Sequence, residues 1–202
     1  IYEVKDIWPL SLVQLSNISA RHPFIIMMGW FEKFAVKKSD IIVSNLPNYG
    51  MHIKNNLRLN KSFTWISNGI NIDQLKEIDH LEEKPRSMIP KDKFVVGYTG
   101  TIGFANSLYS FCKSAELLRT NKNIVFVIVG NGQEKYNLIN SFKHLDNLIF
   151  IDGIPKRQIP SMLDLFDCCF AGLKKVDIYK YGVSLNKLFE YMLSGKPLIY
   201  AI

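Results

Sequence analysis

The sequence lacks a long hydrophobic run: no stretch approaches the roughly 18–20 apolar residues that a membrane-spanning helix needs. Its first residues also lack the basic-then-apolar pattern of a secretory signal peptide. Residue 1 is Ile, and the last residues, PLIYAI, have the pattern of a strand. We therefore expect a fragment of a longer protein, cut within the fold at both ends.

Cysteine is scarce, and the three cysteines lack the spacing of a metal site. Cys168 and Cys169 are adjacent, and adjacent cysteines rarely form a disulfide with each other. We expect them and Cys112 to be small core residues in a reducing cytoplasm. The four histidines also lack partners at metal spacing, so we expect surface or helix positions and no metal for His22, His52, His80 and His144.

The formal charge of +7 is unevenly distributed. Residues 1–92 hold 12 Lys and Arg against 10 Asp and Glu, whereas residues 93–202 hold 13 against 8. An anionic ligand or a membrane surface would suit this excess, and a solvated basic surface would explain it equally well. Many of the basic residues fall in expected loops: Lys156, Arg157, Lys174, Lys175 and Lys180.

From Phe94 onward, short apolar runs alternate with amphipathic segments. This βαβα order predicts an α/β fold with a parallel sheet and helices on both of its faces. The expected strands are FVVGYTG, IVFVIVGNG, NLIFIDG, CCFAGL and PLIYAI. Two of the helices keep their apolar residues on one face, which we expect to be buried: Leu108, Phe111, Cys112, Ala115 and Leu118, and Ile159, Met162, Leu163 and Phe166.

Residues 1–92 repeat the pattern more weakly. We expect helices around Leu10–Ser19 and Pro23–Lys38 and near Asn48–Leu59, with strands at DIIVSN and FTWISNG. The second helix is rich in aromatic residues and has a basic end, so it suits either a packed core or a membrane surface. The polar segment DHLEEKPRSMIPKDK predicts a connection, which divides the chain into domains 1–92 and 93–202.

The segment GVSLNKLFEYMLSGKPLI has the clearest helix boundaries. Ser184 suits an N-cap and Gly195 a C-cap, which predicts a helix over about Leu185–Ser194. Its expected buried stripe is Leu185, Leu188, Phe189 and Met192, and its other face carries Lys187, Glu190, Tyr191 and Ser194.

Lys187 would then lie in the first turn of this helix, where the helix dipole disfavours a cation. A bound phosphate would compensate, held by backbone N–H groups, the Asn186 amide and the Lys187 ammonium. Glu190, one turn later, is placed to accept hydrogen bonds from a ribose diol. The alternative is a weak surface ion pair between Lys187 and Glu190.

Two glycine-containing loops follow expected strands. In YTGTIGFAN, Gly100 and Gly103 permit close approach of the backbone to a diphosphate, although a plain turn explains them equally well. The spacing is not G-x-G-x-x-G, which argues against a dehydrogenase. In VGNGQEK, Gly130 and Gly132 lie at a strand's carboxyl end, where open parallel sheets bind ligands, and turn chemistry also explains both.

The segment GVSLNKLFEYMLSGKPLI resembles the donor-site segment of retaining GT-B glycosyltransferases of family four, as found in bacterial capsule, O-antigen and exopolysaccharide synthesis. Six further segments resemble that family in the same order: YEVKDIWPLSLVQL, SDIIVSN, ISNGIN, GYTGTIG, VIVGNGQEK and IDGIPKRQIPSML.

The resemblance implies two Rossmann-like domains, of which 93–202 would be a nearly complete C-terminal nucleotide-sugar domain and 1–92 the later part of the N-terminal, acceptor-side domain. It implies transfer from a nucleotide diphosphate sugar with retention of configuration, without a cofactor or obligatory metal. The donor-binding residues it implies, together with those argued above, are Gly100, Thr101, Gly103, Gly130, Gly132, Gly153, Ile154, Lys156, Asn186, Lys187, Leu188 and Glu190.

One departure concerns the two glutamates, with seven residues between them, that often mark the family. Glu190 matches the second, but Gly182 stands at the first, which leaves nucleotide binding in place and puts the sugar contacts in doubt. Leu185 also replaces a proline common in the nearest subgroup.

The resemblance also implies the partners. We expect a glycan or polyprenyl-linked acceptor, peripheral contact with the inner face of the cytoplasmic membrane, and no nucleic acid. The fragment itself is expected to be inactive, because the region with the family's catalytic histidine is missing. Two alternatives remain: a non-catalytic nucleotide-sugar or glycan-binding relative, and a GT-B nucleotide-sugar epimerase.

Overall fold

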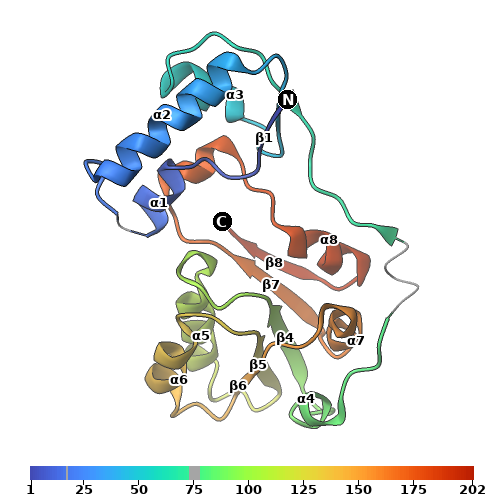
Figure 1. Ribbon diagram of the computed structural model, residues 1–202. Coiled ribbons are helices and arrows are strands. Elements are labelled where there is room, and N and C mark those ends of the chain that lie inside the picture. Colours follow the sequence, from blue (N-terminus) through green and yellow to red (C-terminus); the bar gives the residue numbers. More distant parts are fainter. Residues whose placement is uncertain (17, 73–77) are drawn as a thin grey trace. The chain divides into compact units, whose positions relative to one another are not determined.

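The computed structural model describes residues 1–16, 18–72 and 78–202 (Figure 1). The chain forms two compact units. Unit 1 comprises residues 1–69 and 175–185, and unit 2 comprises residues 70–174 and 186–202. The segment 70–92 thus groups with unit 2, and a short piece of the second half groups with unit 1. The predicted domain boundary near residue 92 in the whole protein stays a prediction.

Unit 2 is built on a five-stranded parallel sheet with the order β6-β5-β4-β7-β8. The α/β prediction, with all five strands in the expected segments, is confirmed. The three central strands are buried along most of their length, as expected for a sheet covered on both faces. The strands are β4 (Phe94–Thr99), β5 (Ile124–Val129), β6 (Leu148–Ile151), β7 (Cys168–Gly172) and β8 (Leu198–Ala201).

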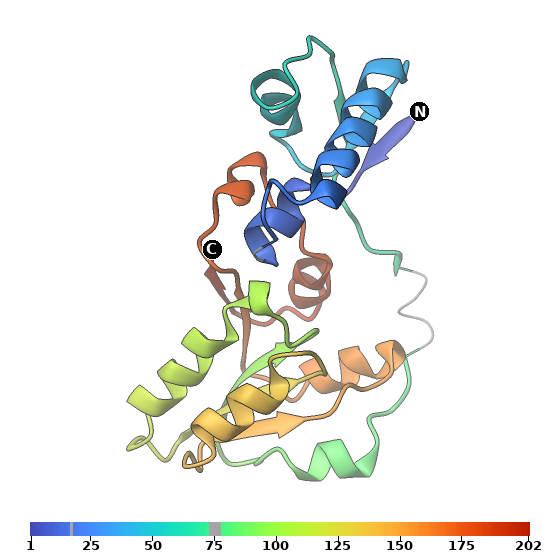
Figure 2. The same cartoon turned by 60° about the vertical axis from the view of Figure 1, so that its left-hand side comes forward.

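Helices cover both faces of this sheet. α5 (Leu108–Leu117) and α6 (Lys135–Phe142) lie side by side over one face, where they share a core with Val96, Phe126 and Ile128 (Figure 2). On the other face, the Phe166 ring that follows α7 (Ile159–Leu163) fills the space beside Gly97, and α8 (Asn186–Leu193) also packs there.

Two details of unit 2 differ from the prediction. Leu118 is 41% exposed, because α5 ends at Leu117 and the last predicted apolar position falls beyond the helix. The segment predicted to be only a connection contains the short helix α4 (Glu83–Ser87). Unit 2 also contains two short 3₁₀ helices, η2 (Phe104–Asn106) and η3 (Lys156–Gln158), and a third, η4 (Asp177–Tyr181), belongs to unit 1.

Unit 1 contains a three-stranded parallel sheet with the order β1-β2-β3, formed by Tyr2–Val4, Ile42–Ser44 and Thr64–Trp65. The first strand was not predicted, because three residues are too few for a recognisable alternation. The helices are α1 (Leu10–Leu15), α2 (Pro23–Lys38) and α3 (Tyr49–Asn55). α1 is shorter than predicted, and residue 17 of the predicted span lies outside the described residues.

α2 has the predicted bounds at both ends. His22 is its N-cap, and the ring Nδ1 accepts a hydrogen bond of 3.2 Å from the backbone N–H of Phe24. Pro23 follows at the first helical position, where a missing N–H costs nothing. His52, on α3, is buried, and its Nε2 lies 2.8 Å from the carboxylate of Glu32 on α2. Glu32 is itself buried, so its carboxylate is not a surface charge.

Residues 175–185 join unit 1 through its core. Ile178 and Tyr181 are buried with the apolar residues of the sheet and α3. The backbone N–H of Ile178 donates to the Gln14 side chain at 2.7 Å, and the Tyr181 hydroxyl donates to Asn56 at 2.8 Å. This pairing of segments more than a hundred residues apart is not visible in the local sequence pattern.

All three cysteines are buried and free, as predicted. Burial raises the pKa of the Cys112 thiol to about 12 and that of Cys169 to about 11, so neither is a thiolate near neutral pH.

Candidate functional site

The candidate site begins at the carboxyl edge of the unit 2 sheet. β4, β5 and β6 end in register there, with Thr99 opposite Val129 and Val129 opposite Ile151. The loops that follow are joined by backbone hydrogen bonds, from Gly100 N–H to Val129 and from Gly130 N–H to Ile151. Three predicted loops therefore meet at one edge, where open parallel sheets bind their ligands.

The glycines of these loops permit a close approach of backbone to backbone. An added Cβ at Gly130 would collide with the Gly100 carbonyl oxygen, and one at Gly132 would collide with the backbone of Ile102. Gly100 has φ +135°, a conformation that other residues rarely adopt, and its added Cβ would lie 3.0 Å from Lys187 Nζ. Gly100 thus leaves room for the lysine beside the loop.

Lys187 extends from the first turn of α8 to the end of β4. Its Nζ donates to the Tyr98 hydroxyl at 2.7 Å and lies 3.9 Å from the centre of the Tyr98 ring. The Tyr98 hydroxyl in turn donates to the carbonyl oxygen of Thr101 at 2.7 Å. Lys187 is therefore tied to the Gly100 loop through one tyrosine, and it differs from the exposed ion pair that was the alternative prediction.

Burial lowers the pKa of the Lys187 ammonium to about 8, although the Glu190 carboxylate acts in the opposite direction. Burial also raises the pKa of Tyr98 above its ordinary value, so its hydroxyl stays neutral. A cation with a depressed pKa beside a loop at a strand end is typical of a site that receives an anion.

α8 is held to β4 by Tyr191. Its hydroxyl accepts from the Thr99 backbone N–H at 2.9 Å and lies 3.2 Å from the Thr99 hydroxyl. Burial raises the pKa of Tyr191 to about 12. Because Tyr191 is one helical turn from Lys187, this contact fixes the lysine's position along the edge.

The predicted orientation of this helix is wrong. Tyr191 is fully buried and Met192 is 72% exposed, so the face with Lys187, Tyr191 and Ser194 lies toward the sheet. The sequence analysis counted Tyr191 as a polar, exposed residue because of its hydroxyl. In the structure this hydroxyl is hydrogen-bonded to Thr99, so the side chain can be buried.

The bounds of α8 also differ slightly from the prediction. The helix begins at Asn186, two residues after the predicted N-cap Ser184, whose carbonyl oxygen accepts from Asn68. Lys187 is therefore its second residue. Gly195 ends the helix with φ +67°, as predicted for a C-cap.

A cavity of about 550 Å³ lies in unit 2 beside the middle of α8. It brings together the predicted site residues Glu190 and Lys156, which are 34 positions apart in the sequence, and it adds Arg157 and Ser194. Its remaining wall is mostly apolar, with Ile70, Ile78, Pro160, Leu163, Asp164 and Leu193. A mostly apolar wall with a few charged groups suits a small organic ligand.

Lys135 is a residue of this edge that the sequence analysis missed. Its Nζ donates to the carbonyl oxygens of Gly130 and Ile151 and to the side chains of Asn131 and Asp152, at 2.6–3.3 Å. The hydrogen bond from Lys135 also holds the pKa of the Asp152 carboxyl below its usual range. Lys135 thus links the ends of β5 and β6 through hydrogen bonds. The only sequence signal for this role was its position directly after the VGNG loop.

Tyr98 and Tyr191 were also missed as site residues, because Tyr98 reads as a core residue of its strand and Tyr191 was assigned only to the polar face of its helix. The remaining predicted residues keep their expected places: Gly103 and Thr101 in the loop after β4, and Gly153 and Ile154 in the loop after β6. Asn186 is exposed and Leu188 half-buried in the first turn of α8.

Gly182, which stands where the family often has a glutamate, lies in unit 1 with φ +109°. An added Cβ would collide with the Pro47 ring. The backbone at this position is therefore shaped for glycine, and a longer side chain does not fit without a rearrangement.

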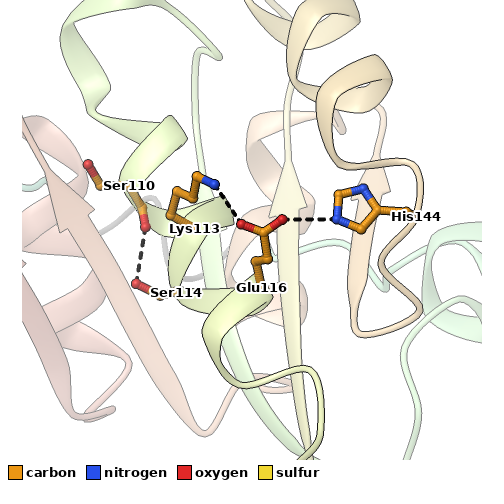
Figure 3. A network of polar contacts seen from close by, with 5 residues as sticks. All are labelled: Ser110, Lys113, Ser114, Glu116 and His144. Atoms are coloured by element: carbon orange, nitrogen blue, oxygen red, sulfur yellow. Dashed lines mark hydrogen bonds and ion pairs between the residues drawn. The ribbon is translucent and has the colours of Figure 1, made fainter.

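A second polar cluster lies away from this edge. Figure 3 shows the Glu116 carboxylate between the Lys113 ammonium at 2.6 Å and the His144 imidazole at 3.0 Å. Glu116 is near the end of α5, toward the opposite edge of the sheet from the glycine loops, and its partners are exposed. We interpret this cluster as a surface network.

Neither a metal site nor a membrane-spanning helix is found in the described part of the chain. No three or more His, Cys, Asp and Glu side chains there are grouped to hold a metal ion. Likewise, no helix among residues 1–16, 18–72 and 78–202 is long and apolar enough to cross a membrane.

The fold of the chain is similar to that of several solved glycosyltransferases. WaaG, a glycosyltransferase involved in lipopolysaccharide biosynthesis, is 12% identical with a TM-score of 0.70, over 98% of this chain and 55% of that one. Anabaena Alr3699/HepE in complex with UDP-glucose is 15% identical with a TM-score of 0.67, over 98% and 52%. The sucrose-phosphate synthase of Thermosynechococcus elongatus is 14% identical with a TM-score of 0.63, over 91% and 46%.

The chain spans about half the length of these structures, and no curated protein sequence matches it. A family profile does match: the one described as "Glycosyl transferases group 1" covers residues 79–200, more than half of the sequence. This span includes α8 and the glycine loops of unit 2. The chain therefore belongs to the group 1 glycosyl transferases.

Proposed function

We propose that this chain carries the donor site of an enzyme that transfers a sugar from a nucleotide diphosphate to a bacterial glycan or polyprenyl-linked acceptor, with retention of configuration. The enzyme would work in the cytoplasm, at the inner face of the membrane. The observation that carries the proposal is the partly buried Lys187 ammonium beside the Gly100 loop. The resemblance described above supplies the acceptor class, the location and the stereochemistry.

Lys187 would bind the diphosphate of the donor. Its present acceptor is one neutral tyrosine hydroxyl, which phosphate oxygens would replace or join with a stronger, charge-assisted hydrogen bond. The first backbone N–H groups of α8 have no partner within the helix and would add to the same anion. Together they would supply the charge compensation that other enzymes obtain from a metal ion.

Glu190 and the cavity would receive the nucleoside. The Glu190 carboxylate lines the cavity one helical turn after Lys187. A diphosphate bound at the start of α8 would therefore place the attached ribose next to this carboxylate. The loop with Gly153 and Ile154 would contact the base through its backbone, with Lys156 beside it. The structure of Anabaena HepE with UDP-glucose, which has the same fold, supports a nucleotide sugar as the ligand.

In the transfer step, the bond between the anomeric carbon and the diphosphate oxygen breaks, the acceptor oxygen bonds to that carbon, and the acceptor's proton passes to the departing diphosphate oxygen. Negative charge develops on the departing diphosphate. Lys187 and the α8 N-terminus would stabilise this charge more strongly than the charge of the bound donor, which lowers the barrier.

The test is product analysis of the full-length protein with a panel of UDP- and GDP-sugars and a polyprenyl-linked acceptor. We expect a new glycosidic bond with the anomeric configuration of the donor, determined by NMR. Lys187→Ala should lower turnover at least a hundredfold without lowering stability, whereas Lys113→Ala should change neither turnover nor stability. Equal losses of stability and turnover in Lys187→Ala would contradict the proposed role.

A non-catalytic binding protein is the second candidate, and Gly182 favours it. The glutamate absent there usually lies near the transferred sugar in the resembling family, and the Pro47 contact leaves no space for it. Nucleotide-sugar binding without any product would support this candidate. An epimerised donor without acceptor modification would instead indicate an epimerase.

A further inference from the structure

A second lysine, Lys174, lies at the same edge of the unit 2 sheet as Lys187. It follows β7, which is the neighbour of β4 in the sheet (Figure 1). The backbone N–H of Lys174 donates to the carbonyl oxygen of Ala105 at 2.9 Å, which joins the end of β7 to the loop after β4. The Lys174 ammonium lies 2.8 Å from the centre of the Phe104 ring in that loop. Backbone and ring contacts together therefore hold this cation at the loop.

Two ammonium groups are thus attached to one loop. Lys187 donates to the Tyr98 hydroxyl, which in turn donates to the Thr101 carbonyl oxygen. Lys174 is attached four residues after Thr101, at Ala105. Four residues of chain span at most about 14 Å, and the 3₁₀ turn η2 that begins within this stretch shortens the span. A ligand of the size of a nucleotide sugar can therefore contact both lysines.

The Lys174 ammonium is not neutralised by a carboxylate. Among residues 1–16, 18–72 and 78–202, no Asp or Glu forms an ion pair with it, and its close partner is the uncharged Phe104 ring. Burial lowers the pKa of Lys174 below its ordinary value, and the more distant Glu134 carboxylate opposes this change. A cation on an aromatic face keeps its charge available to an anionic ligand.

The other basic side chains that follow the strands at this edge are engaged elsewhere. Lys135, after β5, donates to four oxygen atoms and forms an ion pair with Asp152. Lys156 and Arg157, after β6, line the cavity assigned to the nucleoside. Of the described residues of unit 2 that follow β4 to β7, Lys174 is therefore the cation that remains, besides Lys187, for the phosphates of the donor.

The charge of the diphosphate calls for a second cation. Each phosphate of the donor carries a negative charge, and the phosphate that loses the sugar approaches a double charge near pH 7. Lys187 supplies one positive charge, and the N-terminus of α8 supplies about half of one. Most of the charge on the second phosphate is then left without compensation. A cation placed against that phosphate would stabilise the charge that develops during transfer.

We propose that Lys174 binds the phosphate that is joined to the sugar, while Lys187 binds the phosphate that is joined to the ribose. Glu190 and the cavity lie further along α8 than Lys187, so the sugar end of the diphosphate extends the other way, across the loop after β4. The Phe104 ring orients the ammonium and partly shields it from water, which strengthens its attraction to the phosphate. This assignment rests on the proposed function, because it adds a residue to the same donor site.

Two other roles would explain the position of Lys174. Its ammonium would serve only to hold the loop, or a carboxylate from the part of the protein outside this chain would pair with it. In the first case its removal should weaken every nucleotide alike, because the whole loop is displaced. In the second case its removal should lower the stability of the full-length protein and leave nucleotide affinity unchanged.

The experiment is isothermal titration calorimetry of the full-length protein with UMP, UDP, UDP-glucose and UDP-glucuronate, with the matching guanosine compounds in parallel. Lys174→Met should weaken UDP and both UDP-sugars by about tenfold or more, as expected for one charge-assisted hydrogen bond, and leave UMP nearly unchanged. Lys187→Met should weaken UMP as well, because its phosphate is the one joined to the ribose. Lys174→Arg should retain most of the affinity, since arginine keeps the charge and stacks on aromatic rings.

Lys113→Met is the matched control. Lys113 also lies over aromatic rings, 5.9 Å from the centre of Tyr109 and 5.8 Å from that of Phe142, but on α5, away from the glycine loops. Its substitution should change none of the affinities. Phe104→Leu should weaken UDP less than Lys174→Met does, because the charge remains and only its orientation is lost. Circular dichroism and thermal unfolding should show each of these variants folded.

Equal weakening of UMP and UDP by Lys174→Met would overturn the proposal in favour of a role in holding the loop. Unchanged UDP affinity would also overturn it, and a loss confined to UDP-glucuronate would place the lysine at the sugar and not at the phosphate. The proposed function is judged separately, because it stands if the unmodified protein binds UDP and Lys187→Met does not, whatever the result for Lys174→Met. Absence of all nucleotide binding would remove both.

Discussion

Binding of a nucleoside diphosphate should draw a proton onto Lys187. In the free chain, burial places the pKa of this ammonium at about 8, and the ordinary value is 10.5. A diphosphate against the ammonium favours its charged form, so the pKa rises in the complex. Since the folded chain without ligand is partly deprotonated from about pH 7 upward, binding must be coupled to proton uptake there.

The size of the effect follows from the pKa. Uptake should be about one tenth of a proton at pH 7, about half at pH 8 and about nine tenths at pH 9. Above pH 8, the affinity should fall by roughly tenfold per pH unit until the pKa of the complex is reached. The terminal phosphate of the ligand ionises near pH 6, so above pH 7.5 it contributes little.

Isothermal titration calorimetry measures this uptake when UDP or GDP is titrated at one pH into buffers of different ionisation enthalpy. The slope of the observed enthalpy against the buffer enthalpy gives the number of protons. Lys187→Met should abolish the uptake along with most of the affinity, and Lys113→Met should retain both. Binding at pH 8 without uptake, or uptake that persists in Lys187→Met, would show that Lys187 does not meet the diphosphate.

Four further outcomes are expected. Lys187→Met should raise the free energy of unfolding at pH 7 by about 1–3 kcal/mol, because a folded-state pKa below the unfolded one means that the buried charge destabilises the chain at neutral pH. Denaturant titrations should show this gain shrinking from pH 8 and disappearing above pH 10.5. Glu190→Gln should weaken a ribonucleoside diphosphate by about 1.5–3 kcal/mol in calorimetry and leave inorganic pyrophosphate nearly unchanged; equal losses would remove the ribose assignment. Gly182→Glu should lower stability by about 2–4 kcal/mol without increasing activity, since the added side chain meets Pro47, and a stable variant with higher turnover would contradict this. Lys135→Met should cost about 1–3 kcal/mol because the Gly130 carbonyl oxygen loses its Lys135 donor, whereas the Ile151 carbonyl oxygen keeps the Gly130 N–H; it should also raise hydrogen exchange at the ends of β5 and β6, and unchanged exchange there would argue against this role of Lys135.

The strands of unit 2 and the bounds of α2 could be predicted because their signals are local. Buried parallel strands are continuous apolar runs, and α2 carries His22 and Pro23 at its start. The glycine loops could be predicted as neighbours for a similar reason, since carboxyl ends of parallel strands meet at one edge. The small strand Tyr2–Val4 was missed because it is too short to show a period.

Which face of a helix is buried could not be predicted where a polar atom finds its partner far away. Tyr191 looked like a surface residue until the Thr99 backbone, 92 positions earlier, proved to be its partner. The same holds for Lys135, whose four acceptors come from two strand ends. Hydrogen bonds between distant segments depend on how the elements pack, and no local pattern encodes them.

The sequence by itself therefore determined the α/β class, the parallel strands, the glycine loops and the presence of a lysine at the start of α8, because each depends on local periodicity or turn chemistry. Only the tertiary structure decided that Lys187 is partly buried against Tyr98 with a pKa of about 8, since burial is set by the neighbours that surround the ammonium. It also decided that the rings of α2 stay exposed, because a helix that is apolar on every side gives no indication of which side the core will take.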